Sequence, residues 1–469
     1  MLPYLLGGLA VVALAFPANA AAHGIVGKAD LPIPVWLFSW AAAIVLVVSF
    51  VALATMWTRP QLQEQHRRRL FTLPQALEWL AGLFGVGLFA LVLYSGFAGA
   101  QVDTENFSVT FIYVIFWVGT PVASVLFGDV FRALSPWRTC ARALASLVRL
   151  PGRGRASGPP LRYPRWLGLW PASAWIVGFA WLELIYVEKD RPSTLAALSL
   201  AYFLVMLVGM ALFGIEKWSG QADGFGVYFN LLSKLSALVR GRDGVVYLRR
   251  PLSGVSGLEI RSGTVAFICT QIGTTTFDGF SNSSLWQRSE PHLQSAFESL
   301  GFNPTPAQEL AYSVGLLFCI LLIGGVYRAG IFGMRRVSQR YATDTLVRAF
   351  VHTLAPIAFA YVLAHYFSLL LWQSQAMVYL ASDPLGNGAN IFGTKHFQID
   401  YHVISYVEIW YVQVAALIAG HVGALALAHD RALVLYKDPR EAVRSQYWML
   451  AVMVAFTSLG LWLLSDVAT

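Results

Sequence analysis

The stretch GTVAFICTQIGTTTFDGF, residues 263–280, decides how many times this chain crosses a membrane. It begins as an apolar run and ends with three consecutive threonines, Asp278 and Gly279. Polar or irregular backbone at membrane depth is tolerated only where protein buries it or where it lines a wet cavity. We therefore expect a broken polar crossing over about 262–284 that forms the wall of a site. The alternative is a re-entrant or surface loop whose Thr and Ser side chains cap a helix end.

The composition of the whole chain places it in a lipid bilayer. Its 469 residues are 57% hydrophobic and 12% charged, with a mean hydropathy of +0.59. Runs of about 20 apolar residues are typical of membrane-spanning helices. The sequence predicts an all-α, polytopic transmembrane helix bundle with nine clear spans, at about 34–57, 77–99, 107–134, 166–187, 194–215, 307–334, 346–373, 403–428 and 446–465.

The positive charges orient these spans, because loops rich in Lys and Arg remain in the cytoplasm. The loops carrying QHRRRL (65–70) and RTCARALASLVRLPGRGR (138–155) are predicted to be cytoplasmic, whereas QVDTENF (101–107) is external. The segments KLSALVRGRDGVVYLRR (234–250) and RRVSQR (335–340) must then both be cytoplasmic. An additional crossing is needed between them, so ten crossings result, with the mature N-terminus outside the cytoplasmic membrane of a bacterium.

The domain organisation is simple. Residues 1–22 have the apolar core and small-residue cleavage pattern of a signal peptide, and 23–469 form a single membrane domain. Cytoplasmic linkers are expected over about 135–165 and 216–260. Within the second, 221–240 has the pattern of an interfacial helix, with these residues toward lipid: Phe225, Tyr228, Phe229, Leu232 and Leu235. We see no nucleic-acid-binding module, and the sequence does not specify an oligomeric state.

Ionisable residues within spans are energetically expensive and indicate function. Five lie near the outer ends of their spans, where they could share one outward-opening cavity: Glu183, Asp278, His365, His402 and Glu408. Histidines and carboxylates that converge can hold a divalent ion, most readily Zn²⁺, with Mn²⁺ or Cu²⁺ as alternatives. In this hypothesis His365, His402 and Asp278 bind the metal, and Asp278, Glu408 and Glu183 are the candidate catalytic carboxylates. The same groups could instead bind protons or a cationic substrate.

A second set of ionisable residues lies toward the inner ends of the spans. Asp129, His352 and His421 form a predicted secondary polar cluster, and His429 has the position of an interfacial residue beside Asp430. The alternative for His352 and His421 is a neutral imidazole hydrogen-bonded between helices.

Three stretches resemble a family of bacterial, largely actinobacterial, membrane proteins named fenitrothion hydrolase: AHGIVGKADLPIPVWLFSWAAAIVLVVSFVALA (22–54), SDPLGNGANIFGT (382–394) and WYVQVAALIAGHVGALALAHDRAL (410–433). The resemblance implies hydrolysis of an apolar organophosphorus ester, and it transfers no catalytic residues. A second hypothesis is a proton- or cation-coupled transporter, in which Glu183 and Asp278 carry the ion. A third is a membrane scaffold whose polar residues join helices.

Overall fold

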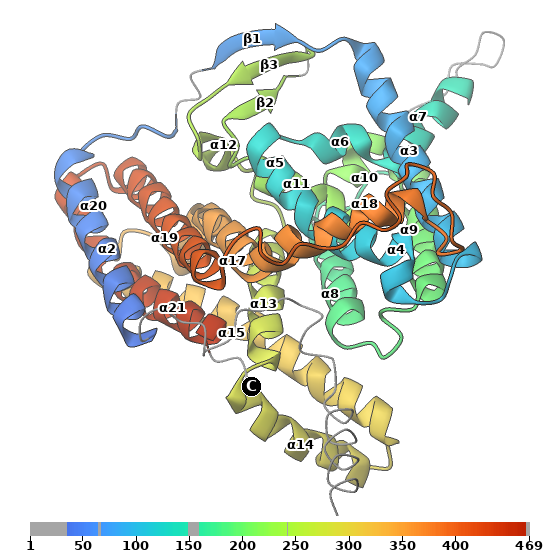
Figure 1. The fold of residues 1–469 in the computed structure, drawn as a ribbon. Helices are drawn as coiled ribbons and strands as arrows, with labels where there is room; N and C mark the ends of the chain where they lie inside the picture. The colour runs from blue at the N-terminus through green and yellow to red at the C-terminus, as the bar shows by residue number, and fades with distance from the viewer. Residues whose placement is uncertain (1–34, 64–66, 149–158, 242, 466–469) are drawn as a thin grey trace, which may run out of the picture.

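The computed structural model describes residues 35–63, 67–148, 159–241 and 243–465. The expected signal peptide, 1–22, lies outside this part of the chain. The described residues form a helix bundle with one small sheet at its end (Figure 1). Eight helices in this part of the chain are long and apolar enough to cross a membrane, which confirms a polytopic α-helical membrane protein: Trp36–Met56, Gln75–Ala98, Phe107–Phe127, Pro192–Phe213, Pro304–Val337, Thr343–Ser382, Tyr406–Tyr436 and Pro439–Leu463.

The helices form two groups. The first consists of α2 and most of the helices from residue 304 onward (Figure 1). The interface between α17 and α19 is close, because a Cβ at Gly420 would clash with the Cβ of Ala360. Small residues that let helix backbones approach are typical of membrane bundles. The members of this group are α2 (Val35–Met56), α15 (Pro304–Val337), α16 (Thr343–Phe350), α17 (Ala355–Gln373), α19 (Tyr406–Tyr436), α20 (Pro439–Ser445) and α21 (Tyr447–Ser465).

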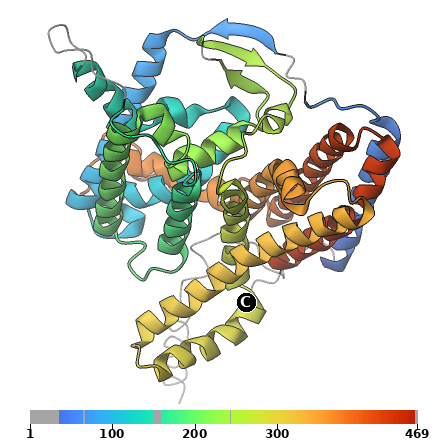
Figure 2. The same cartoon turned by 180° about the vertical axis from the view of Figure 1, so that it is seen from behind.

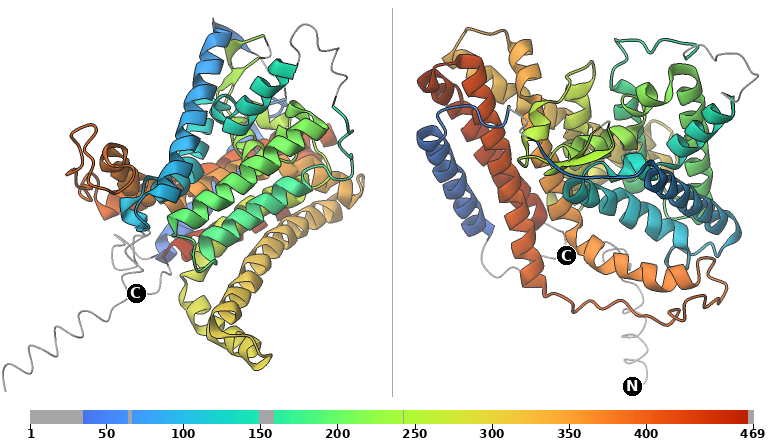
Figure 3. Two further views of the ribbon diagram at one scale, coloured as in Figure 1. Left: turned by 90° about the vertical axis from the view of Figure 1, so that its right-hand side faces the viewer. Right: turned by 90° about the horizontal axis from the view of Figure 1, so that it is seen from above.

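The second group contains the spans that follow α2, as far as α9, and α8 and α9 run side by side in it (Figure 3). The span Phe107–Phe127 in this group is a stack of three segments, with the π-helix η4 (Phe111–Gly119) between α4 (Phe107–Thr110) and α5 (Thr120–Phe127). The other members are α3 (Gln75–Ala98), α6 (Val130–Leu134), α7 (Pro136–Val148), α8 (Trp170–Leu184), α9 (Pro192–Phe213), α10 (Ile215–Ser219) and α18 (Met377–Ser382).

Helix α13 (Thr264–Ser281) joins the two groups, because it packs against α15 and α17 on one side and against α8 on the other. The expectation of a broken segment is wrong over this range, since α13 is a continuous helix of 18 residues. Its threonines satisfy their hydroxyls locally: Thr275 Oγ1 donates to the Gln271 carbonyl and Thr276 Oγ1 to that of Ile272. A polar sequence therefore remains helical without needing a break.

The interruption falls just beyond α13, at Asn282 and Ser283. Ser283 Oγ accepts a hydrogen bond from the Trp286 N–H and caps α14 (Ser284–Ser299). Helix α14 and the N-terminal part of α15 project beyond the rest of the bundle in Figures 1 and 3, and Figure 2 shows α15 running across the back.

A three-stranded antiparallel sheet of order β1-β3-β2 lies at the opposite end. It pairs β1 (Arg68–Thr72) with β3 (Val245–Leu248), and β3 with β2 (Leu238–Arg240). Two of the arginine-rich segments predicted to be cytoplasmic, 65–70 and 234–250, therefore meet in this sheet. Residues 216–260 are not a simple linker, because they also contain α11 (Gly224–Ser233) and α12 (Ser253–Ser256).

Helix α11 is a core helix, which corrects the prediction of an interfacial helix over 221–240. Phe225, Tyr228 and Phe229 are buried, and α11 packs against α5 and α8. Its N-cap, Asp223, accepts hydrogen bonds from Trp137 Nε1 in α7 and other donors, and these hold the start of the helix inside the protein. An apolar helical face fits lipid or protein equally well, so the sequence pattern did not distinguish the two.

Candidate functional site

The central polar contact of the bundle joins α13 to α17. Asp278 Oδ2 accepts a hydrogen bond of 2.6 Å from the Tyr366 hydroxyl, and it lies 2.8 Å from His365 Nε2. The side chains of Asp278 and His365 are 12% and 10% exposed. His365 and Tyr366 are consecutive on α17 and both reach the same carboxylate oxygen. The structure therefore builds a mostly buried Asp–His–Tyr contact between two helices of the bundle.

A second carboxylate faces this contact from α8. Glu183 lies within electrostatic range of Asp278 and of the Tyr366 hydroxyl. The Trp117 indole N–H faces both Glu183 and Tyr366, outside the geometry of a regular hydrogen bond. Two carboxylates, an imidazole and a phenol thus share one region inside the protein, contributed by α8, α13 and α17. We refer to Asp278, His365, Tyr366 and Glu183 as the central site.

The π-helix η4 brings aromatic residues to this site. Trp117 and Tyr113 both belong to η4, which packs against α17. Tyr113 lies in electrostatic range of Glu183 and donates a hydrogen bond of 2.7 Å to the Lys189 carbonyl. π-Helical turns are rare and occur frequently at functional sites. Tyr366, Trp117 and Tyr113 could not be predicted as site residues, because an aromatic residue in an apolar span carries no local mark of function.

Two of the five residues predicted for an outer cavity do not join the central site. Glu408 forms a capping box at the start of α19, where its Oε2 accepts 2.9 Å and 2.7 Å hydrogen bonds from Ser405 N and Oγ. His402 is exposed, and its backbone N–H donates to Asp400 Oδ1. Glu408 instead satisfies the backbone donors of its own helix end.

The residues at hand do not fit the predicted divalent metal. Among the described residues, no group of three or more His, Cys, Asp or Glu side chains is placed to hold a metal ion. A catalytic zinc site takes three protein ligands. Asp278 and His365 provide only two, and His402 does not join them. We therefore derive no chemical step through a metal.

The predicted inner cluster is also not formed. Asp129 caps α6 through the Arg132 N–H at 3.2 Å and accepts a 2.7 Å hydrogen bond from Asn230 Nδ2. The fully buried His421 places Nδ1 2.8 Å from the Leu417 carbonyl, so Nδ1 carries the proton. His352 is buried in η5 (Val351–Leu354). Each of these residues lies in its own local environment. The position of a residue along its helix does not specify which neighbouring helix the side chain contacts.

A further buried carboxylate, Asp430, lies in α19 near the inner ends of the helices. Its Oδ1 accepts hydrogen bonds from the Trp57 indole N–H at 3.1 Å and from the backbone N–H groups of Gln61 and Leu62. Its Oδ2 accepts a 2.8 Å hydrogen bond from Gln63 Nε2. Asp430 is completely buried. It therefore fixes the chain that leaves α2 for the sheet, a role that no sequence pattern indicated.

His429 completes this attachment rather than lying at an interface as predicted. It is buried, and its Nε2 lies 2.9 Å from the Trp57 carbonyl. Gln446 Nε2 lies 3.2 Å from its Nδ1. Because the amide donates and the carbonyl accepts, Nδ1 accepts from Gln446 and Nε2–H donates to the Trp57 carbonyl.

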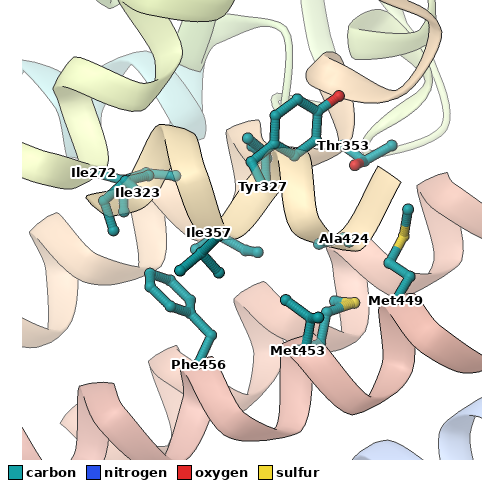
Figure 4. A pocket seen from close by; sticks show the side chains of 13 residues that line it. Ile272, Ile323, Tyr327, Thr353, Ile357, Ala424, Met449, Met453 and Phe456 are labelled. Atoms are coloured by element: carbon teal, nitrogen blue, oxygen red, sulfur yellow. The ribbon is translucent and has the colours of Figure 1, made fainter. Parts of the chain in front are cut away.

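An apolar cavity lies between α13, α15, α17, α19 and α21 (Figure 4). Its volume is about 60 Å³, whereas pockets for drug-sized molecules occupy about 300 Å³ or more. Its walls offer no carboxylate or imidazole. It is lined mainly by aliphatic, sulfur-containing and aromatic side chains, including Ile272, Ile323, Ile357, Met449, Met453 and Phe456. The cavity is therefore a packing feature separate from the central site.

The chain matches no family model, no curated protein and no solved structure at a significant level.

Proposed function

We propose that this multi-pass membrane protein is a transporter that couples solute movement to protons, and that the central site binds the protons. One observation carries the proposal: Asp278, inside the bundle, is bonded to His365 and Tyr366 and lies in electrostatic range of Glu183. Ionisable groups inside a membrane protein are costly and are typical of proton and ion pathways. The three helices that supply them pack directly against one another or through α13.

The arrangement supports reversible protonation for an electrostatic reason. Two carboxylates in a poorly solvated region repel each other, and a bound proton removes part of this repulsion. His365 can hold the proton as an imidazolium paired with Asp278, or release it and leave the pair linked by a hydrogen bond. Groups coupled in this way titrate together, so the central site exchanges its protons as a unit.

The proposed membrane is the bacterial cytoplasmic membrane, with the sheet on the cytoplasmic side and the mature N-terminus outside. This orientation is supported by the arginines that surround β1, β3 and α7, among them Arg68, Arg142 and Arg250. Positively charged loops remain in the cytoplasm during insertion.

A pH-jump experiment tests the proton site without knowledge of the solute. Proteoliposomes of the full chain are adsorbed on a solid-supported membrane, and the charge displaced by a rapid pH change is recorded. We expect a transient current that is abolished in Asp278→Asn and reduced in His365→Gln. The exposed Glu408→Gln is the matched control and retains the wild-type current. Equal currents in wild type and Asp278→Asn would remove the site from the mechanism. Solute-dependent acidification of the vesicle lumen then identifies the cargo.

A second candidate, hydrolysis of an apolar organophosphorus ester, is supported by the Asp278–His365 contact alone. With Nε2 bonded to Asp278, His365 has Nδ1 as a base for a water molecule. The test is release of 4-nitrophenolate from diethyl 4-nitrophenyl phosphate by the purified protein. Turnover that disappears in His365→Ala but survives in Glu408→Gln supports this activity. Absence of turnover in the wild type excludes it for this ester.

A further inference from the structure

The three-stranded sheet gathers positive charge at one of its ends. In the β1–β3 register Arg68 lies opposite Leu248, so the residues before β1 and after β3 meet. An open hollow of about 460 Å³ lies at this end. The residues that line it are Arg67, Arg68, Leu248, Arg249 and Arg250.

Among the described residues, no carboxylate forms an ion pair with Arg68, Arg249 or Arg250. Buried Arg249 donates from Nε and Nη2 to the Ser236 and Ser233 carbonyls, which are neutral acceptors. Arg68 and Arg250 are exposed, and neither forms an ion pair with a described residue. Arg250 Nη1 donates only to a backbone carbonyl, that of Gln61. The guanidinium groups therefore present several N–H donors to an anion, in a geometry suited to phosphate.

Asp243, the acidic residue between β2 and β3, lies at the end of the sheet opposite the hollow. Asp243 lies in the turn before Val245, which pairs with Thr72 at the far end of β1. Its Oδ2 accepts a 2.6 Å hydrogen bond from the Tyr247 hydroxyl. Asp243 therefore does not neutralise the arginines at the Arg68 end of the sheet.

The same strands also expose apolar side chains close to a spanning helix. Leu70 and Phe71 in β1 and Leu248 in β3 are 43%, 54% and 40% exposed. β1 ends at Thr72 and α3 begins at Gln75, so at about 3.3 Å per residue the strand ends within about 10 Å of the helix. Exposed apolar residues beside arginines are typical of surfaces that lie in the headgroup region of a bilayer.

We propose that this arginine hollow binds the phosphate headgroup of an anionic phospholipid, while Leu70, Phe71 and Leu248 contact its glycerol and upper acyl region. The sheet is thereby anchored to the leaflet it faces, and with it the loop between α2 and α3. This inference does not rest on the proposed transport activity. It requires only the sheet, its register and its position beside α3.

The test measures lipid retention by the full chain in detergent. Native mass spectrometry records bound lipid after titration with phosphatidylglycerol or phosphatidylcholine. The variant is Arg68→Gln with Arg250→Gln. Its matched control is Arg335→Gln with Arg336→Gln, which removes two exposed charges from the end of α15. Each arginine near a membrane surface strengthens binding to anionic lipid about fivefold, so the sheet variant loses about twenty-five-fold affinity for phosphatidylglycerol.

Three outcomes overturn the proposal. The first is equal retention of the two lipids by the wild type. The second is equal loss in the sheet variant and the α15 variant, which indicates only overall charge. The third is complete displacement of phosphatidylglycerol by millimolar inorganic phosphate, which indicates a free-anion site. Retention of phosphatidylglycerol in phosphate buffer, lost in the sheet variant alone, supports the proposal. The thermal stability of both variants is measured beside it to show that they are folded.

Discussion

Asp278 and Asp430 are both buried carboxylates in a membrane bundle, yet their partners differ in kind. Asp430 accepts hydrogen bonds from an indole, two backbone amides and a side-chain amide, none of which changes its charge near neutral pH. Asp278 is bonded to an imidazole and a phenol, with a second carboxylate in electrostatic range. Burial is therefore common to both carboxylates, and the difference lies in their partners. Only Asp278 is bonded to an imidazole, the type of side chain that gains and loses a proton near neutral pH, which is the basis for proposing a proton-binding role for Asp278 and not for Asp430.

The first prediction tests the structural side of this comparison and has the largest effect. Asp430→Ala leaves the donors from Trp57, Gln61, Leu62 and Gln63 without their acceptor. We expect a loss of about 3–5 kcal/mol of unfolding free energy, because several hydrogen bonds to one buried carboxylate are lost together and their donors stay buried. The measurement is denaturant or thermal unfolding of the detergent-solubilised protein, with Asp278→Asn as the control. An unchanged melting temperature in Asp430→Ala would show that the α2–β1 connection does not need this carboxylate.

The second prediction concerns the coupling within the central site. Tyr366→Phe removes the 2.6 Å hydrogen bond to Asp278 and is expected to cost about 1.5–3 kcal/mol. In Asp278→Asn the same substitution is expected to cost less, because the acceptor is no longer charged. A double-mutant cycle on unfolding free energies measures the difference. Strictly additive losses would show that the two side chains are not energetically coupled.

The third prediction compares these buried groups with the exposed Glu408. Ser405→Ala removes half of the capping box of α19 and is expected to cost about 1 kcal/mol. Glu408→Gln is expected to leave the pH-jump current unchanged, since its carboxylate serves the helix end. Unfolding experiments and current recordings on both variants check this. A current lost in Glu408→Gln would return Glu408 to the central site.

The smallest effect is expected at Asp223, a third buried carboxylate. Burial raises the pKa of Asp223 above its usual value, and hydrogen bonds from the Gly226 N–H, Tyr202 and Trp137 oppose this shift only in part. The folded state then binds more protons than the unfolded state between the two pKa values, so unfolding free energy falls as pH rises through that window. Unfolding measured from acid to neutral pH should show this slope, and Asp223→Asn should flatten it. A slope of the opposite sign would mean that the hydrogen bonds outweigh burial.

Local features of the fold followed from local sequence. Eight of the nine predicted apolar runs coincide with described helices that are long and apolar enough to cross a membrane, because hydrophobic length is set by bilayer thickness. The ninth, 166–187, contains only the 15-residue helix α8. The prediction failed where a pattern permits two environments. The apolar face of α11 fits lipid or protein, and the threonines of α13 fit a break or a helix that satisfies their hydroxyls internally.

The central site was predictable only in part. Glu183, Asp278 and His365 were identified because ionisable residues inside spans are rare. Their depth also suggested His402 and Glu408, which the structure places at the exposed start of α19. Tyr366, Trp117 and the buried role of Asp430 could not be found, because each depends on a neighbour more than 60 residues away.

The sequence by itself determined that this protein lies in a lipid bilayer, the approximate bounds of its spans and the short list of ionisable residues within them. These are sums over local hydropathy and charge, which the order of residues contains directly. Only the tertiary structure decided which of those residues meet. The contact of Asp278 with His365, the attachment of Asp430 to the α2–β1 connection and the arginine hollow all depend on how helices rotate and pack. Packing is fixed by the fit of whole surfaces, and no single stretch of sequence contains that fit.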